Sequence, residues 1–159
     1  MTMEGSLYLI RHGKAGAAQR GKNDFYRPLT EAGQTEWREF LQTMKPLIET
    51  EDLHVWTSPL LRAKQTTDIF NEIFQIDSST EKDFLVNGDL QACLKNLQEL
   101  EQPFRVACIG HEPYLTAWLS ELTGKRVKVD KGTILKIDFK DNRATLDWRQ
   151  SPNRKSLFN

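Results

Sequence analysis

The sequence predicts an α/β fold: a three-layer sandwich with a mostly parallel central sheet, helices on both faces and a C-terminal antiparallel hairpin. Short apolar runs alternate along the chain with segments whose apolar residues recur every three to four positions, an order typical of a sheet covered by helices. The first run, residues 6–10, leaves no polar face, as expected for a strand buried on both sides. The length of 159 residues predicts a single domain, 1–159, with a core of about residues 6–152.

The N-terminal third is predicted to hold one strand, one long loop and one helix. The loop 14–27 is long for a strand-to-helix connection and rich in Gly, Lys, Gln and Asn. Such loops are usually functional or mobile, and the sequence leaves open whether this one closes over a substrate. Thr30 is a suitable N-cap for an amphipathic helix that runs to about residue 48 and is broken or kinked near Pro46.

The middle of the chain predicts a second strand at about residues 53–57. Pro59 suits the first turn of the helix that follows. Residues 80–86 are compatible with a short edge strand. Another helix is expected to begin at Asn87-Gly88-Asp89 and to end before Pro103.

The C-terminal third predicts a strand over residues 105–109 and then a helix. The polar connector 125–132 leads to two strands, 133–139 and 144–149, that we expect to form an antiparallel hairpin. The tail 153–159 is expected to be frayed.

Composition excludes several classes of function. The chain has 22 basic and 22 acidic residues, so no overall charge favours binding to nucleic acid or to a membrane surface. No apolar run approaches membrane-spanning length, and the N-terminus lacks a secretory signal pattern. The two cysteines, Cys93 and Cys108, are expected to be small core residues rather than a disulfide. The expected location is cytoplasmic.

Cationic and imidazole side chains follow three of the predicted strands. Arg11-His12-Gly13 comes after the first strand, Ser58 to Arg62 after the second, and Gly110-His111 after the strand 105–109. In α/β proteins the carboxyl ends of the strands usually hold the chemistry. Arginine binds two phosphate oxygens at once and stays charged, so Arg11 and Arg62 can converge on one phosphoryl group if their strands are neighbours.

A neutral His12 can then attack that phosphoryl group in line. Its other ring nitrogen must be held protonated by a carbonyl or a hydroxyl group, and Gly13 and Ser58 are the candidates for this supporting role. Arg27 is either a third phosphate ligand or a salt-bridged loop residue. His54 stands in no motif and is interpreted as structural.

These motifs together resemble the histidine phosphatase superfamily. Further similarity lies in Arg27-Pro28-Leu29-Thr30-Glu31-Ala32-Gly33, in Ser58-Pro59-Leu60-Leu61-Arg62-Ala63-Lys64-Gln65-Thr66 and in the closing residues 148–152, so that most of residues 6–152 are covered. The chain looks most like the small bacterial phosphohistidine phosphatases of SixA type. The resemblance implies that His12 is phosphorylated during turnover and that His111 contributes to the phosphate pocket.

Other kinds of site are unsupported. The sequence has neither glycine-rich nucleotide motif, GxxxxGK[ST] or GxGxxG, and no GxSxG nucleophile elbow. Its three histidines stand in unrelated motifs without carboxylates at metal-ligand spacing. We therefore expect no metal and no cofactor.

The general acid is where the sequence departs from larger members of that superfamily. Those members use a Glu or Asp to protonate a leaving alkoxide, and Asp83 is the nearest match here, followed by Asp24, Asp89 and Glu112. A phosphoimidazole leaving group needs less help from an acid. The leading hypothesis is therefore a phosphatase that acts on phosphohistidine of a signalling or phosphotransfer protein and releases inorganic phosphate.

Three alternatives remain. The second hypothesis is a metal-independent phosphatase of a small phosphorylated metabolite, with Asp83 as acid. The third is a non-catalytic module that binds phosphorylated groups through the arginines. A mutase is disfavoured because the chain lacks a long capping insertion. The sequence leaves the oligomeric state open.

Overall fold

The computed structural model describes residues 2–18, 20–21 and 23–158. A seven-stranded sheet with the order β3-β2-β4-β1-β5-β6-β7 runs through the molecule. Four neighbouring strands are parallel: β3 (Thr80–Glu81), β2 (His54–Thr57), β4 (Phe104–Gly110) and β1 (Gly5–Arg11). The other three are antiparallel: β5 (Ile134–Lys140), β6 (Arg143–Ser151) and β7 (Arg154–Phe158).

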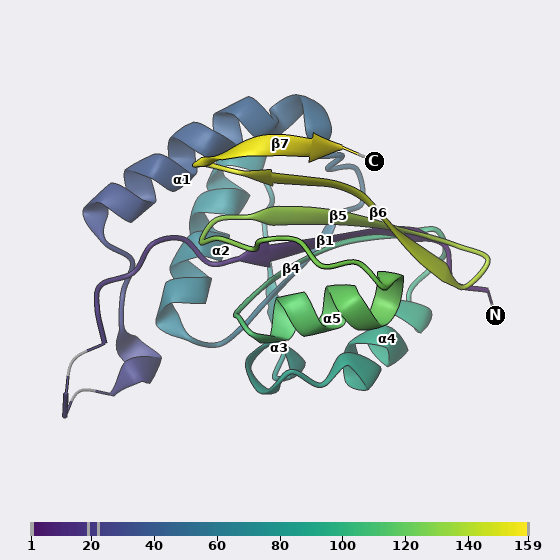
Figure 1. Ribbon diagram of the computed structural model, residues 1–159, viewed down its shortest axis with the longest axis horizontal. Coiled ribbons are helices and arrows are strands. Elements are labelled where there is room, and N and C mark those ends of the chain that lie inside the picture. Colours follow the sequence, from purple (N-terminus) through teal and green to yellow (C-terminus); the bar gives the residue numbers. More distant parts are fainter. Residues whose placement is uncertain (1, 19, 22, 159) are drawn as a thin grey trace.

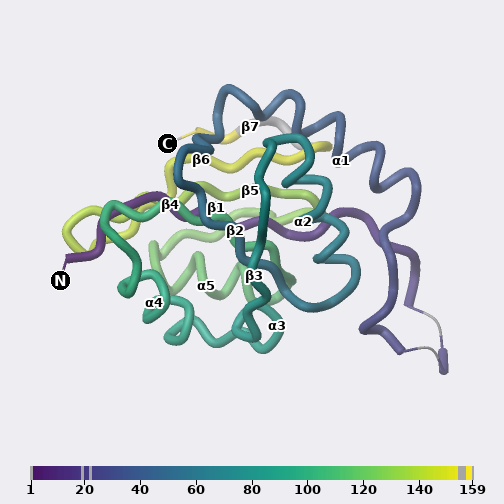
Figure 2. Tube along the Cα trace, turned by 180° about the vertical axis from the view of Figure 1, so that it is seen from behind, coloured from purple at the N-terminus to yellow at the C-terminus, as the bar shows by residue number. Residues whose placement is uncertain are grey.

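Helices cover both faces of this sheet (Figure 1, with the reverse view in Figure 2). One face carries α1 (Glu31–Met44) and α2 (Leu61–Phe74), and the other carries α3 (Phe84–Asn87), α4 (Leu90–Gln98) and α5 (Tyr114–Thr123). Two short 3₁₀ helices, η1 (Asp24–Tyr26) and η2 (Lys45–Leu47), lie in connections. The predicted α/β sandwich is confirmed.

The central strands form two cores because successive side chains point to opposite faces. In β1, Leu7 and Leu9 pack with the helices α4 and α5, whereas Tyr8 and Ile10 pack with α1 and α2. All four side chains are fully buried. The all-apolar pattern of this strand is thus explained by helices on both sides.

Local signals set the helix ends. The Thr30 hydroxyl accepts the Gly33 N–H at 2.9 Å as the N-cap of α1. That helix gives way to the 3₁₀ turn η2 at Lys45, just before Pro46, as the sequence predicts. Asp89 caps α4 by accepting from the Ala92 N–H at 3.1 Å.

One local expectation holds only in part, and another is wrong. Residues 80–86 form a strand only at Thr80–Glu81 and then turn into the helix α3. Residues 153–158 are not frayed, because Arg154–Phe158 pairs with β6 as an edge strand. Their backbone groups find partners across the sheet, which no local pattern reveals. Residue 159 lies outside the described residues.

Cys93 and Cys108 are buried in the core, and their thiols form no disulfide. None of the helices in the described part of the chain combines the length and the apolar character that crossing a membrane requires.

Candidate active site

The three predicted motifs meet at one edge of the sheet. β2, β4 and β1 are parallel neighbours, and their last residues lie nearly level, with Arg11 opposite Gly110 and Thr57 opposite Ile109. The chain leaves β1 toward α1 on one face and leaves β4 toward α5 on the other. Such a divergence opens a crevice between the two strands, where α/β proteins bind ligands.

His12 lies at this divergence and is 6% exposed. Its Nδ1–H donates to the Gly13 carbonyl at 2.7 Å. A carbonyl only accepts hydrogen bonds, so the proton is on Nδ1 and the lone pair is on Nε2. Burial lowers the pKa of His12 to about 3, and the nearby charges of Arg62 and Arg11 act in the same direction. The ring is therefore neutral and suited to nucleophilic attack.

The second histidine, His111, faces His12 with 5.2 Å between ring centroids. Its Nε2 lies 2.7 Å from the Ser58 hydroxyl, which also accepts the Leu60 N–H at 3.2 Å. The hydroxyl can donate to Nε2, which leaves Nδ1–H available as a donor. That Nδ1 is buried without a hydrogen-bond partner among the described residues. Burial, then the charges of Arg62 and Arg11, lower the pKa of His111 to about 4.

Both arginines carry unused buried donors. The Arg11 Nη1 donates to the Val129 carbonyl at 2.9 Å, and the Arg62 Nη1 donates to the Asp24 carbonyl at 2.9 Å. In the described structure the Nε of each arginine is buried without a partner. A buried donor without an acceptor costs about 1–3 kcal/mol. An anion placed between the two guanidinium groups would remove this cost.

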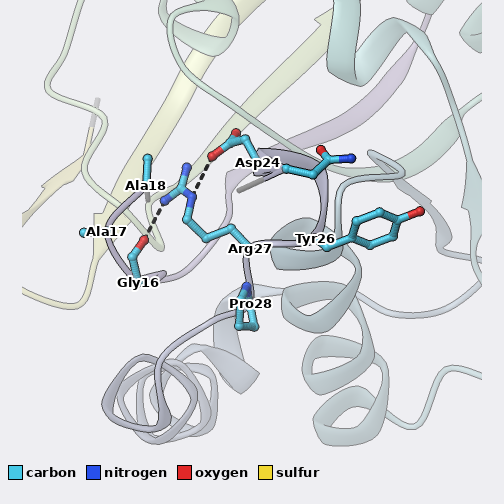
Figure 3. A pocket seen from close by; sticks show the side chains of 8 residues that line it. Gly16, Ala17, Ala18, Asp24, Tyr26, Arg27 and Pro28 are labelled. Carbon is cyan, nitrogen blue, oxygen red and sulfur yellow. Dashed lines mark hydrogen bonds and ion pairs between the residues drawn. The ribbon is translucent and has the colours of Figure 1, made fainter. Parts of the chain in front are cut away.

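Asp24 already supplies one negative charge to this region. Its carboxylate lies 3.1 Å from the Arg62 Nη2 and accepts from the Arg27 Nε at 2.8 Å. The Arg27 hydrogen bond is the main reason why the pKa of Asp24 is lowered, and the charge of Arg62 adds to it. Arg27 also donates to the Gly16 carbonyl at 2.8 Å (Figure 3). The sequence left Arg27 as either a phosphate ligand or a salt-bridged loop residue, and the structure shows the salt bridge, with Asp24.

Supporting contacts hold the motif loops in place. The Gly13 N–H donates to the Thr66 hydroxyl at 3.0 Å, and that hydroxyl donates to the Arg62 carbonyl at 2.7 Å. The loop of His12 is thereby tied to the N-terminal half of α2. At the start of α1, a Cβ at Gly33 would collide with the Lys14 carbonyl, which explains the glycine in this helix entry.

Gly13 holds the His12 ring as expected, but Ser58 does not, because its hydroxyl contacts His111 instead. β4 lies between β2 and β1, so the loop after β2 meets the loop that carries His111. Asp83 is different, because it is exposed at the start of α3 and its carboxylate makes no hydrogen bond or ion pair with any described residue. Sequence reasoning gave Asp24 only as a reserve acid and assigned no role to Thr66. The ion pair of Asp24 could have been expected from its position three residues before Arg27, since oppositely charged residues at that spacing often pair.

No group of three or more His, Cys, Asp or Glu side chains in the described part of the chain is arranged to hold a metal ion.

Comparisons with known proteins found a family model, a relative and solved structures that are similar to this chain. The model of the histidine phosphatase superfamily (branch 1) matches residues 7–85. An uncharacterized protein of Picosynechococcus sp. is 30% identical over 146 residues, which span 81% of this chain and 82% of the relative.

Among solved structures, the protein histidine phosphatase SixA complexed with tungstate superposes with a TM-score of 0.77. It is 26% identical, and the match covers 92% of this chain and 97% of the other. A proposed SixA phosphohistidine phosphatase of Agrobacterium tumefaciens has a TM-score of 0.81 at 24% identity, with 95% and 100% covered. The phosphoserine phosphatase of Entamoeba histolytica has the same fold, with a TM-score of 0.69 at 17% identity and 92% and 97% covered.

Proposed function

This chain belongs to the histidine phosphatase superfamily, and from its membership we propose that it removes phosphate from phosphohistidine on a signalling or phosphotransfer protein. The observation that carries the proposal is the state of His12. Its Nδ1 proton is held by the Gly13 carbonyl, which leaves the Nε2 lone pair for attack. The charges of Arg11 and Arg62 act on the ring, and the Nε of each arginine and the Nδ1 of His111 have no partner among the described residues. We expect the reaction to take place in the cytoplasm, where the unpaired cysteines fit a reducing environment.

The first step transfers the phosphoryl group to the enzyme. Arg11 and Arg62 bind its oxygens while the His12 Nε2 attacks phosphorus in line with the substrate's P–N bond. The substrate imidazole enters protonated on its second nitrogen and leaves neutral. His12 becomes a phosphorylated imidazolium whose positive charge is stabilised by the Gly13 carbonyl.

The second step hydrolyses the phosphoenzyme. Water attacks phosphorus, the bond to the His12 Nε2 breaks, and inorganic phosphate leaves. The electron pair of that bond returns to Nε2, which restores the neutral ring with its proton on Nδ1. We assign to His111 a hydrogen bond from Nδ1–H to the transferring group, because this donor has no other described partner.

The alternative is a phosphatase of a small phosphomonoester. An alkoxide leaving group needs a proton donor, an effect of about a hundredfold or more. Asp83 is our candidate from the sequence, although it is exposed and its carboxylate has no partner among the described residues. Asp24 forms an ion pair with Arg62, but its pKa is lowered. Its carboxylate is therefore ionised at neutral pH and has no proton to donate. The other two candidates are engaged elsewhere, because Asp89 caps α4 and Glu112 accepts from the Thr116 hydroxyl. The lack of an evident proton donor among the described residues favours the phosphohistidine substrate.

The test measures phosphate release from a histidine-phosphorylated phosphotransfer domain. We compare the wild type with His12→Ala and, as a matched control, with His54→Ala, which removes an exposed histidine. Release above spontaneous hydrolysis that only His12→Ala abolishes, with acid-labile label trapped on the wild type, is the expected result. Absence of both release and label under any phosphodonor would instead indicate a non-catalytic binding module.

A second assay separates the two substrate classes. Small phosphomonoesters are offered to the wild type and to Asp83→Ala. Hydrolysis that is fast in the wild type and lost in Asp83→Ala would favour the small-molecule alternative, whereas indifference to that substitution counts against it.

A further inference from the structure

Two hollows lie near Arg62 and Arg11: the first is lined by Asp24, the ion-pair partner of Arg62, and the second is lined by Arg11 itself. The first, of about 520 Å³, has apolar walls from Ala17, Ala18, Tyr26 and Pro28 and polar groups from Asp24 and Arg27 (Figure 3). It adjoins the catalytic pocket because Asp24 holds Arg62 with both its carboxylate and its backbone carbonyl. Any group bound here lies beside the phosphoryl site.

Two exposed aromatic residues belong to the turn that forms this first hollow. Phe25 is 38% exposed and Tyr26 is 66% exposed. Their rings pack edge to face at 5.0 Å, and Figure 3 shows the Tyr26 ring directed away from Arg27. Two hydrogen bonds support the turn: the Asn23 side chain accepts the Phe25 N–H at 2.9 Å, and the Arg27 Nε donates to the Asp24 carboxylate at 2.8 Å. Rigid, exposed aromatic groups supply large contact area with little loss of entropy, which is typical of protein-binding surfaces.

The second hollow, of about 560 Å³, lies beside Arg11. Arg11 lines it together with two further basic residues, Arg126 and Lys128, and two acidic ones, Glu112 and Asp130. Arg126 and Lys128 are exposed, whereas one oxygen of Glu112 accepts the Thr116 hydroxyl at 2.8 Å. The surrounding connector, residues 125–132, has four basic residues and one acidic residue in a chain that is balanced overall. This side of the site therefore favours an acidic partner.

Building on the proposed function, we infer that the two hollows form a docking surface for the folded protein that carries the phosphohistidine. That protein presents an apolar side chain to the Tyr26 hollow and acidic side chains to Arg126 and Lys128. A small metabolite needs only the arginines that bind its phosphoryl group, whereas two hollows of this size and of different chemistry suit a protein surface.

The experiment compares a protein donor with a small one. The protein donor is a histidine-phosphorylated phosphotransfer domain, and the small donor is phosphoramidate, which also has a P–N bond. The variants are Tyr26→Ala and the double change Arg126→Glu/Lys128→Glu. The matched controls are Phe158→Ala, which removes another exposed aromatic ring, and Lys45→Glu, which reverses another exposed lysine.

Each docking variant should raise KM for the phosphorylated domain about tenfold and leave kcat/KM for phosphoramidate within twofold of the wild type. The defect of the double charge change should shrink as salt is added, because salt screens exposed charges, whereas the Tyr26→Ala defect should not. The two controls should resemble the wild type with both donors.

Other outcomes overturn the inference in distinguishable ways. An unchanged KM for the domain would mean that the hollows are not used, while the proposed function would stand. Equal losses with both donors would mean that the turn and the connector only position the arginines. A wild type that hydrolyses small esters but not the phosphorylated domain would end the proposed function and the docking surface together.

Discussion

Acidification should destabilise this protein through the two buried histidines of the site. The pKa of His12 is lowered to about 3 and that of His111 to about 4, mainly by burial. In the unfolded chain each imidazole has a pKa of about 6.5. Below that pH the two histidines take up protons in the unfolded chain but stay neutral in the folded protein. The free energy of unfolding is therefore highest above about pH 6.5 and decreases as the pH falls. Between pH 7 and pH 5 the loss is about 2 kcal/mol for each histidine, or about 4 kcal/mol together.

Urea unfolding at pH 7 and at pH 5 measures this loss. The wild type is compared with His12→Asn/His111→Asn, which removes both titrating groups, and with His54→Asn as the exposed control. The wild type and the control should lose about 4 kcal/mol more than the double variant over this interval. A double variant that loses as much as the wild type would refute the reasoning, because the two rings would then not be held neutral by burial.

Three further changes test other contacts of the site. Gly33→Ala should cost about 2 kcal/mol or more in urea unfolding, because its methyl group meets a backbone carbonyl, whereas Gly16→Ala, with nothing within 4 Å, should stay within about 0.5 kcal/mol. Ser58→Ala removes the hydroxyl at 2.7 Å from the His111 Nε2 and should lower kcat about tenfold with little change in KM. Asp24→Asn removes a carboxylate that competes with phosphate for two guanidinium groups, so product phosphate should inhibit at roughly tenfold lower concentration. Equal stability of Gly33→Ala and Gly16→Ala would contradict the first expectation. An unchanged kcat of Ser58→Ala would contradict the second, and weaker inhibition of Asp24→Asn by phosphate would contradict the third.

The elements with strong local signals could be predicted from the sequence. The buried strand at residues 6–10, the Thr30 cap and the helix end near Pro46 depend on interactions between close neighbours, so they appear in the structure nearly where they are expected. The tail was mistaken for a frayed end because pairing between Arg154–Phe158 and β6 is decided by long-range backbone hydrogen bonds.

The same division applies to the site. The sequence by itself determined which chemical groups stand at three strand ends, because Arg11-His12-Gly13, Arg62 and His111 follow apolar runs that can only be strands or core. Only the tertiary structure decided that these groups meet. It inserts β4 between β1 and β2, which brings the His111 ring to 5.2 Å from the His12 ring, and it folds the loop of Asp24 back onto Arg62. Strand order and loop closure depend on contacts between residues far apart in the chain, and such contacts leave no periodic pattern in a single sequence.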